Sequence, residues 1–173
     1  MNGLHLKMKS KIYLAKSNKA NPDQLMAVRA MLSRFDVDVV EYNGGKYSHK
    51  PMLECDKLFI LPDLYNYDED EDCVGIGKGL HQQIETWHNQ RNEKDDEVYM
   101  IVNPGDDYYL RKVDDLDMVD GDNYVDYSVA VLDYNYNTTM LTHLIQFFGK
   151  PNLGELKVNK NITNKYKYLL CSK

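Results

Sequence analysis

The continuous apolar run KLFIL at Lys57–Leu61 constrains the fold more than any other stretch of this chain. The run ends at Pro62 and contains no alternation of polar with apolar residues. A strand of this kind is covered on both faces, as the central strands of parallel sheets are. The run therefore predicts a sheet that has helices on both of its faces.

Three other segments are predicted to be strands of the same sheet: Lys11–Lys16, Val37–Tyr42 and Glu97–Val102. Apolar residues recur at helical spacing after Pro22 and again over Lys78–Arg91. Strands interleaved with helices over spans of this length are typical of parallel sheets with right-handed crossovers. We therefore expect an α/β fold: a flavodoxin-like or Rossmann-like parallel sheet of about five strands, with helices on both faces.

The ends and the third quarter of the chain are predicted from weaker patterns. We treat the whole chain as a single α/β domain with a polar leader over residues 1–10. Residues 106–128 mix acids and tyrosines with little periodicity, which indicates an excursion on the surface. Val129–Leu132 is the expected fifth strand, and Thr138–Phe148 is an expected helix with a Thr cap. Residues 150–173 are expected to form a C-terminal arm or an edge strand.

Charge and composition argue against several classes of protein. The 21 Lys+Arg against 27 Asp+Glu give a formal net charge of −6, which disfavours a broad nucleic-acid surface. The apolar runs are too short to cross a bilayer and the start does not resemble a signal peptide, so we expect no membrane partner and a cytoplasmic location. The cysteines and histidines show no ligand spacing, so we expect no disulfide, metal or other cofactor. The wealth of Asn, Lys and Tyr is typical of AT-rich genomes such as those of many bacteriophages.

The sequence VGIGKGL contains the best site signal in the chain, the glycines Gly75, Gly77 and Gly79. We expect them to form a turn whose backbone amides meet an anion or a polar ligand edge at the start of the following helix. The pattern differs from G-x-G-x-x-G because position 80 is Leu, and it differs from a Walker motif because no Gly-Lys-Ser/Thr follows. The alternative is a turn that needs small residues so that the helix packs closely on the sheet.

The acidic stretch Asp68–Asp72 begins like a calcium-binding EF-hand loop. The sixth position of that loop, however, is Cys73 rather than Gly, and the twelfth is Gly79 rather than Glu. We therefore expect a solvated acidic loop and no metal site.

Order and spacing connect five segments of the chain: KIYLAKS, CDKLFILPD, EDCVGIGKG, QQIETW and EVYMIVNP. Together they resemble the nucleoside 2-deoxyribosyltransferase-like family over roughly residues 10–105. The resemblance implies a flavodoxin-like sheet whose strand ends hold a nucleoside or nucleotide. In the enzymes of this family, a Glu on the helix after the glycine turn attacks the anomeric carbon of the sugar and expels the base.

The residue that matches this nucleophile is Gln83, four positions after the last glycine and just before Ile84. A neutral amide can hydrogen-bond a sugar hydroxyl, but it is a very poor nucleophile and cannot stabilise oxocarbenium charge as a carboxylate does. Glu85 is the other candidate, and two residues along a helix rotate a side chain by about 200°. We therefore expect Glu85 to point away from whatever Gln83 faces. Cys73 occupies the place of a helper Asp of the family.

Our leading hypothesis is a noncatalytic nucleoside- or nucleotide-binding protein. In addition to the glycines of residues 75–79, its pocket is expected to contain Lys16, Ser17, Asp63, Lys78 and Gln83. Lys16 and Lys78 would neutralise phosphate, and Gln83 would hydrogen-bond the ribose. Such a binder would suit the sequestration of a nucleotide signal.

Two alternatives stay open. One is an active N-glycosyl enzyme, either a nucleoside deoxyribosyltransferase or a nucleoside hydrolase, that uses Glu85 or an acid of residues 68–72. The other is a structural or protein-interaction module without a ligand, in which residues 106–136 and 162–173 form the contact surface. The resemblance also implies a homo-oligomer, because related enzymes complete their sites with residues of a neighbouring subunit.

Overall fold

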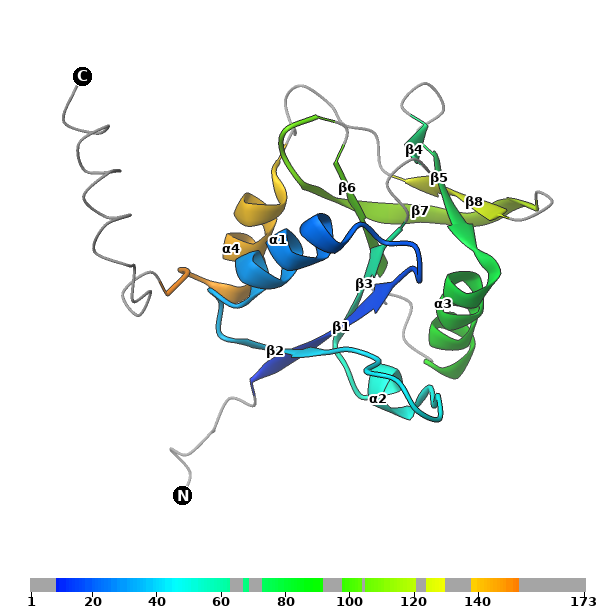
Figure 1. Cartoon of the computed structure of the whole chain (residues 1–173), viewed down its shortest axis with the longest axis horizontal. Coiled ribbons are helices and arrows are strands. Elements are labelled where there is room, and N and C mark those ends of the chain that lie inside the picture. The colour runs from blue at the N-terminus through cyan, green and yellow to red at the C-terminus, as the bar shows by residue number, and fades with distance from the viewer. Residues whose placement is uncertain are drawn as a thin grey trace.

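The computed structural model describes residues 9–62, 67–68, 73–91, 98–103, 105–120, 124–129 and 138–152. Within this part of the chain the fold is α/β, as predicted, and Figure 1 shows its arrangement. The elements follow one another as β1 (Ser10–Lys16), α1 (Pro22–Leu32), β2 (Val37–Val40), α2 (Lys50–Leu53), β3 (Lys57–Leu61), β4 (Tyr67–Asp68), β5 (Cys73–Gly77), α3 (Lys78–Gln90), β6 (Val98–Val102), β7 (Tyr109–Asp120), β8 (Tyr124–Val129) and α4 (Met140–Phe148).

The described strands form one eight-stranded sheet in the order β2-β1-β3-β6-β7-β8-β5-β4. β1 is parallel to both β2 and β3, and β3 is parallel to β6. β7 is antiparallel to β6. The five neighbouring strands β2, β1, β3, β6 and β7 thus form a mostly parallel part of the sheet, which confirms the predicted flavodoxin-like or Rossmann-like fold. The chain moves outward from β1 in opposite directions, first to β2 and then to β3. In open sheets of this kind, ligands bind at this switch point, beyond the carboxyl ends of the strands.

Helices cover both faces of the parallel strands, as the apolar run of β3 predicts. Leu58 and Ile60 share a core with α2 and α3, whereas Phe59 and Leu61 share the opposite core with α1 and α4. All four side chains are buried. Figure 1 shows α1 and α4 lying together on one side of the sheet and α2 and α3 on the other.

The predicted helix signals are confirmed where the structure describes them. Asn21 caps α1 by accepting a hydrogen bond from the backbone N of Asp23 at 2.8 Å. Thr139 caps α4, which ends at Phe148 and has Gly149, with a φ of 88°, as its C-cap residue. α3 buries Leu80, Ile84 and Trp87 along one face. No helix in the described residues is long and apolar enough to cross a bilayer.

The predicted glycine turn is wrong. Gly75 and Gly77 belong to β5, which pairs antiparallel with β8, and α3 begins directly after β5 at Lys78. The neighbouring Val74 and Ile76 are buried, so the segment has the alternation of a strand. Of the three glycines, only Gly79 lies in α3, and Gly77 is the N-cap residue of α3.

The predicted surface excursion over residues 106–128 is also wrong. β7 and β8 occupy most of this segment and connect the parallel strands to β5. Leu110 of β7 and Val125 and Tyr127 of β8 are buried in the two cores. A register shift between Val113 and Met118 marks an irregularity where β7 passes from one neighbour to the other.

Some predictions are only partly covered by the described residues. Asp68 lies in the short strand β4 rather than in a loop, and the rest of the acidic stretch is outside the described residues. The expected fifth strand begins at Val129, the last residue of β8, and the positions after it are also outside. Asp63 and the expected C-terminal arm beyond residue 152 lie outside the described residues as well.

Candidate functional site

A cleft of about 970 Å³ lies at the carboxyl end of β1, where the sheet order reverses. The loop after β1, the start of α1, the segment between β2 and α2, and the first turns of α3 surround it. The residues that line the cleft are Tyr13, Leu14, Ala15, Lys16, Ser17, Asn18, Lys19, Ala20, Pro22, Leu25, Tyr42, Tyr47, His49, Gly77, Gly79, Leu80, Gln82 and Gln83. Its place agrees with the general position of ligand sites in such sheets.

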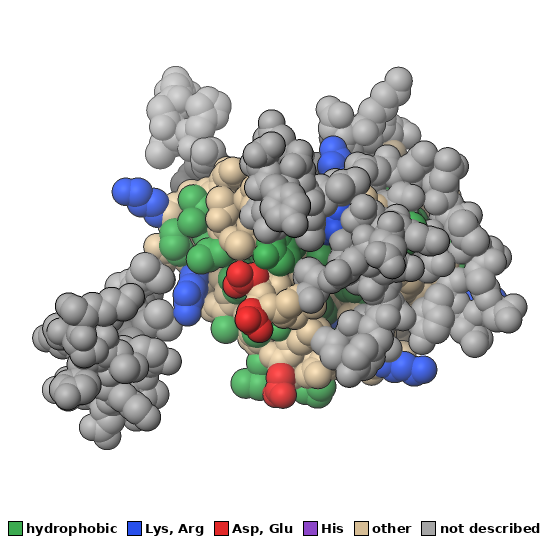
Figure 2. Space-filling view, turned by 90° about the horizontal axis from the view of Figure 1, so that it is seen from above, with side chains coloured by type: hydrophobic (Ala, Val, Ile, Leu, Met, Phe, Trp, Pro, Cys, Tyr) green, Lys and Arg blue, Asp and Glu red, His purple; other side chains and the backbone are tan. Residues whose placement is uncertain are grey.

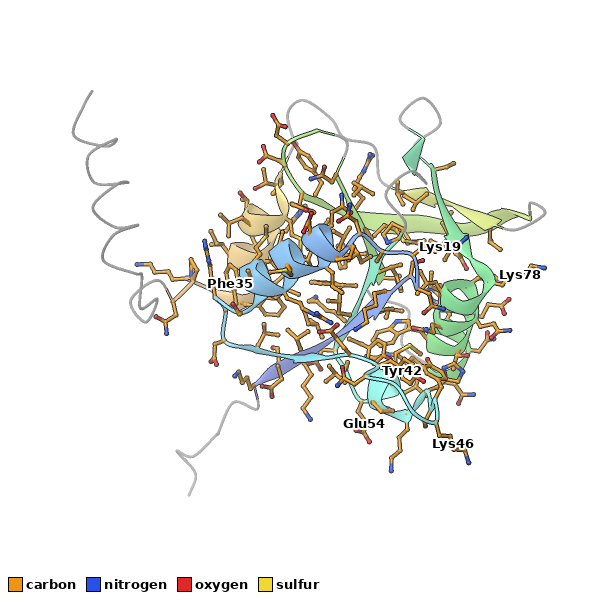
Figure 3. All side chains as sticks on the ribbon, viewed as in Figure 1. Lys19, Phe35, Tyr42, Lys46, Glu54 and Lys78 are labelled. Carbon is orange, nitrogen blue, oxygen red and sulfur yellow. The ribbon has the colours of Figure 1, made fainter. Side chains whose placement is uncertain are left out.

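The loop between β1 and α1 is held in a compact turn. The backbone N of Ser17 donates to the carbonyl of Leu61 at 3.1 Å, which ties the end of β1 to the end of β3. The Ser17 hydroxyl accepts from the backbone N of Lys19 at 3.1 Å. These contacts leave the Lys19 side chain exposed at the cleft, and Figure 3 shows it on this loop.

Lys16 lines the cleft, but its ammonium group is already paired with a carboxylate. Its Nζ lies 2.7 Å from Oε1 of Glu41, which also accepts hydrogen bonds from Arg29 at 2.8 to 3.2 Å. Burial of the Glu41 carboxyl opposes its ionisation, but the hydrogen bonds from Arg29 and Lys16 outweigh burial and hold its pKa below the ordinary value. Lys19, whose side chain is exposed at the cleft, is therefore more available to an anion than Lys16, whose ammonium group is paired with Glu41.

An aromatic wall, made of Tyr13, Tyr42, Tyr47 and His49, forms one side of the cleft. The rings of Tyr42 and Tyr47 meet edge to face with centroids 5.4 Å apart, and Tyr47 meets His49 in the same way at 4.9 Å. The Tyr42 hydroxyl donates to the carbonyl of Gly45, whose φ of 82° requires a residue like glycine. Burial raises the pKa of Tyr13 to about 12, so its hydroxyl stays protonated at neutral pH.

The start of α3 also lines the cleft. Gly77 provides no side-chain cap, so the first backbone N–H groups of the helix have no capping side chain. A Cβ atom added at Gly77 or Gly79 would meet nothing within 4 Å. Close packing of the helix on the sheet therefore does not explain these glycines, and both of them line the cleft.

Gln83 and Glu85 face different surroundings, as their separation on the helix predicts. Gln83 lines the cleft, and its Oε1 atom is buried without a hydrogen-bond partner in the described structure. The Glu85 side chain is 52% exposed, and its Oε1 lies 3.2 Å from Nε2 of His81. His81 also bonds through Nδ1 to the buried Tyr127 hydroxyl at 2.6 Å, which ties α3 to β8.

The structure places the predicted site residues in different surroundings. Five of the eight expected ligand-binding residues line the cleft: Lys16, Ser17, Gly77, Gly79 and Gln83. Gly75 is buried in β5 and does not line it, and Asp63 is outside the described residues. Lys78 is exposed on the outer side of α3, away from the cleft, as Figure 3 shows. The catalytic candidate Glu85 also lies away from the cleft lining.

Sequence reasoning missed the aromatic wall and Lys19. A signal for the wall was available, because Tyr42 and Tyr47 flank Asn43-Gly44-Gly45 just beyond a predicted strand. Segments that follow strands of a parallel sheet lie at its ligand-binding edge.

The chemistry of the cleft favours binding. Its described lining contains lysine, tyrosine, histidine and glutamine side chains but neither Asp nor Glu. Across the described residues, no three His, Cys, Asp or Glu side chains come together as a metal site. Figure 2 shows the charged side chains of the described residues scattered over one face of the molecule, without a gathered basic patch.

Comparison with family models, with curated proteins and with solved structures finds no match to this chain.

Proposed function

We propose that the cleft binds a nucleoside or nucleotide and does not cleave it. The observation that carries this proposal is Gln83, which lines the cleft and whose buried Oε1 has no hydrogen-bond partner in the described structure. A buried acceptor without a partner costs about 1–3 kcal/mol. A ligand hydroxyl that donates to this oxygen would recover that cost, and the resemblance implies that a sugar binds at this position.

The other groups of the cleft suit the remaining parts of such a ligand. Tyr42 and Tyr47 are 41% and 36% exposed, so their rings are accessible for contact with a base. Lys19 and the uncapped start of α3 can receive a phosphate group. The volume of about 970 Å³ is at the upper end of the range for small-molecule sites.

The described lining of the cleft contains no carboxylate that could take the part of the nucleophilic Glu of the family. Displacement of a base at the anomeric carbon needs a nucleophile or a base that activates water. The Gln83 amide can do neither, and Glu85 pairs with His81 away from the cleft. We therefore favour binding over the N-glycosyl enzyme.

Titration calorimetry tests the proposal, with the common ribonucleosides, deoxynucleosides and their mono- and diphosphates as probes. Chromatography of the same samples reports any release of free base. We expect saturable heat with at least one probe, no free base, and a loss of about tenfold in affinity in Gln83→Ala. Glu85→Gln is the matched control and should bind as the wild type does.

Two results would contradict the proposal. Absence of heat with every probe would favour the interaction module without a ligand. Release of base that Glu85→Gln abolishes and Gln83→Ala leaves intact would favour the N-glycosyl enzyme.

We also propose that the chain forms a homo-oligomer, which only the resemblance supports. Native mass spectrometry of protein purified without added nucleotide reports the number of subunits and any bound small molecule together. A monomer at micromolar concentration would contradict this part of the proposal.

A further inference from the structure

Glu41, the residue directly after β2, holds two cations at the edge of the cleft. Its Oε1 atom lies 2.7 Å from Nζ of Lys16, the last residue of β1, which lines the cleft. The Arg29 guanidinium of α1 bonds both carboxylate oxygens, through Nη2 to Oε1 at 2.8 Å and through Nε to Oε2 at 2.9 Å. Arg29 itself does not belong to the described lining. The Glu41 carboxylate therefore links a cation of the cleft to a cation outside it.

This cluster of Arg29, Glu41 and Lys16 carries a formal net charge of +1, because it contains two cations and one carboxylate. The Glu41 side chain is only 15% exposed, so its carboxylate would bear a large desolvation cost without a cationic partner. Arg29 alone can offset that cost, since an Arg that bonds both oxygens of a carboxylate forms a strong and well-oriented pair. Lys16 is thus the surplus cation of the cluster.

The backbone of Lys16 is fixed, but its ammonium group can exchange one anionic partner for another. Lys16 pairs with Leu61 in the register of β1 with β3, and the next backbone N, that of Ser17, donates to the Leu61 carbonyl. A lysine ammonium lies on a flexible four-carbon stem and acts as a point charge. It can therefore turn from Oε1 of Glu41 to a phosphate oxygen in the cleft while Arg29 continues to neutralise the carboxylate.

We propose that Arg29 is a positioning residue for the charge of the ligand: by neutralising Glu41, it makes Lys16 available to the phosphate of a nucleotide. The inference rests on the proposed nucleoside or nucleotide binding and adds the group through which the site favours the phosphorylated ligand. Without Arg29, Lys16 would be the remaining cation of the cluster. Its transfer to a phosphate would then leave a largely buried carboxylate uncompensated.

Calorimetry at neutral pH tests the inference by comparing the common ribonucleosides with their 5′-monophosphates. The readout is the ratio of nucleoside Kd to nucleotide Kd, because a change that merely loosens the fold weakens both ligands alike. Arg29→Gln should lower this ratio on the order of tenfold, since the phosphate must then compete with Glu41 for Lys16. The double variant Arg29→Gln/Glu41→Gln should restore at least the wild-type ratio, because no carboxylate is left to hold Lys16.

Two further variants separate this positioning role from the loss of a positive charge. Lys16→Gln should lower the ratio by itself, and adding Arg29→Gln to it should change the ratio little, because Arg29 acts through Lys16. Arg34→Gln is the matched control, since it removes the same charge just beyond the end of α1, at a position that does not line the cleft. It should keep the wild-type ratio.

Four results overturn the inference while leaving the proposed function intact. They are an unchanged ratio in Arg29→Gln, an equal fall in Arg34→Gln, no recovery in Arg29→Gln/Glu41→Gln, and an unchanged ratio in Lys16→Gln. If none of the probes binds to the wild type, the proposed function fails and the inference fails with it.

Discussion

Replacing Gln83 with Met should make the free protein more stable while weakening its binding to the ligand. The Gln83 Oε1 atom is buried and has no hydrogen-bond partner in the described structure, so the free protein bears an uncompensated desolvation cost. That cost is about 1–3 kcal/mol for a fully buried group, and Gln83 as a whole is only partly buried. We therefore expect a gain of about 1 kcal/mol. Met has a similar length and nearly the same helix propensity as Gln, so the backbone of α3 contributes little to the change.

The two effects are measured separately. A gain of about 1 kcal/mol raises the Tm by about 2–4 °C in a domain of this size, which thermal unfolding followed by circular dichroism can resolve. Loss of one hydrogen bond to the ligand weakens the affinity about tenfold, as measured by calorimetry.

Gln90→Met serves as the control, because Gln90 is exposed on the same helix and does not line the cleft. It should change neither the Tm nor the affinity. The reasoning is refuted if Gln83→Met lowers the Tm, since Gln83 would then stabilise the free protein, or if the affinity does not change.

Three further predictions concern groups around the cleft. Glu41→Gln should lower the unfolding free energy by about 1–2 kcal/mol at pH 7, because it weakens the bonds to Lys16 and Arg29. Since the pKa of Glu41 is depressed, this stabilisation is present above the ordinary carboxyl pKa of about 4.3 and is lost as the pH falls through the folded-state value. Urea titrations should therefore show the difference shrinking below about pH 4, and a constant difference would argue against the ion pairs. Gly79→Ala should raise the unfolding free energy by up to about 1 kcal/mol, because an added Cβ meets nothing within 4 Å; a lower Tm would contradict the open space at this position. Lys19→Glu should weaken nucleotide binding at least about tenfold and leave nucleoside binding nearly unchanged, and an equal loss for both would exclude a phosphate contact.

The parallel half of the fold was predictable because its signals are local. The strand at Lys57–Leu61 is a continuous apolar run, and α1 has its own cap at Asn21. The run at Lys57–Leu61 predicts burial on both faces, and the two cores on either side of β3 confirm it. These features need no knowledge of distant residues.

The antiparallel half was not predictable in the same way, because its strands pair across long separations. Gly75 of β5 lies opposite Asp126 of β8, and neither segment indicates the other. β8 does alternate, with Val125, Tyr127 and Val129 buried, but tyrosine is as common on surfaces as in cores, so the sequence alone does not separate a buried strand from a surface segment here. In β7, the burial of Arg111 next to Leu110 breaks any simple alternation of polar and apolar residues.

The candidate site was predicted where it depends on the helix and missed where it depends on a loop. Helical spacing is sufficient to separate Gln83 from Glu85. The presence of Tyr47 and Tyr13 in the same cleft lining, in contrast, requires the segment after β2 to fold back toward the end of β1, and the glycines with positive φ at Gly44 and Gly45 permit this without specifying it.

The most direct test of the account is a nuclear magnetic resonance titration of isotope-labelled protein with a nucleotide that binds. It observes the protein and the ligand in one sample. We predict shifts in the backbone amides of Gly77 and Gly79 and in the side-chain amide of Gln83, with little change on α4. The anomeric proton signal of the ligand should persist overnight. Shifts that avoid the cleft, or the appearance of free base and free sugar, would contradict a site that binds a nucleotide without cleaving it.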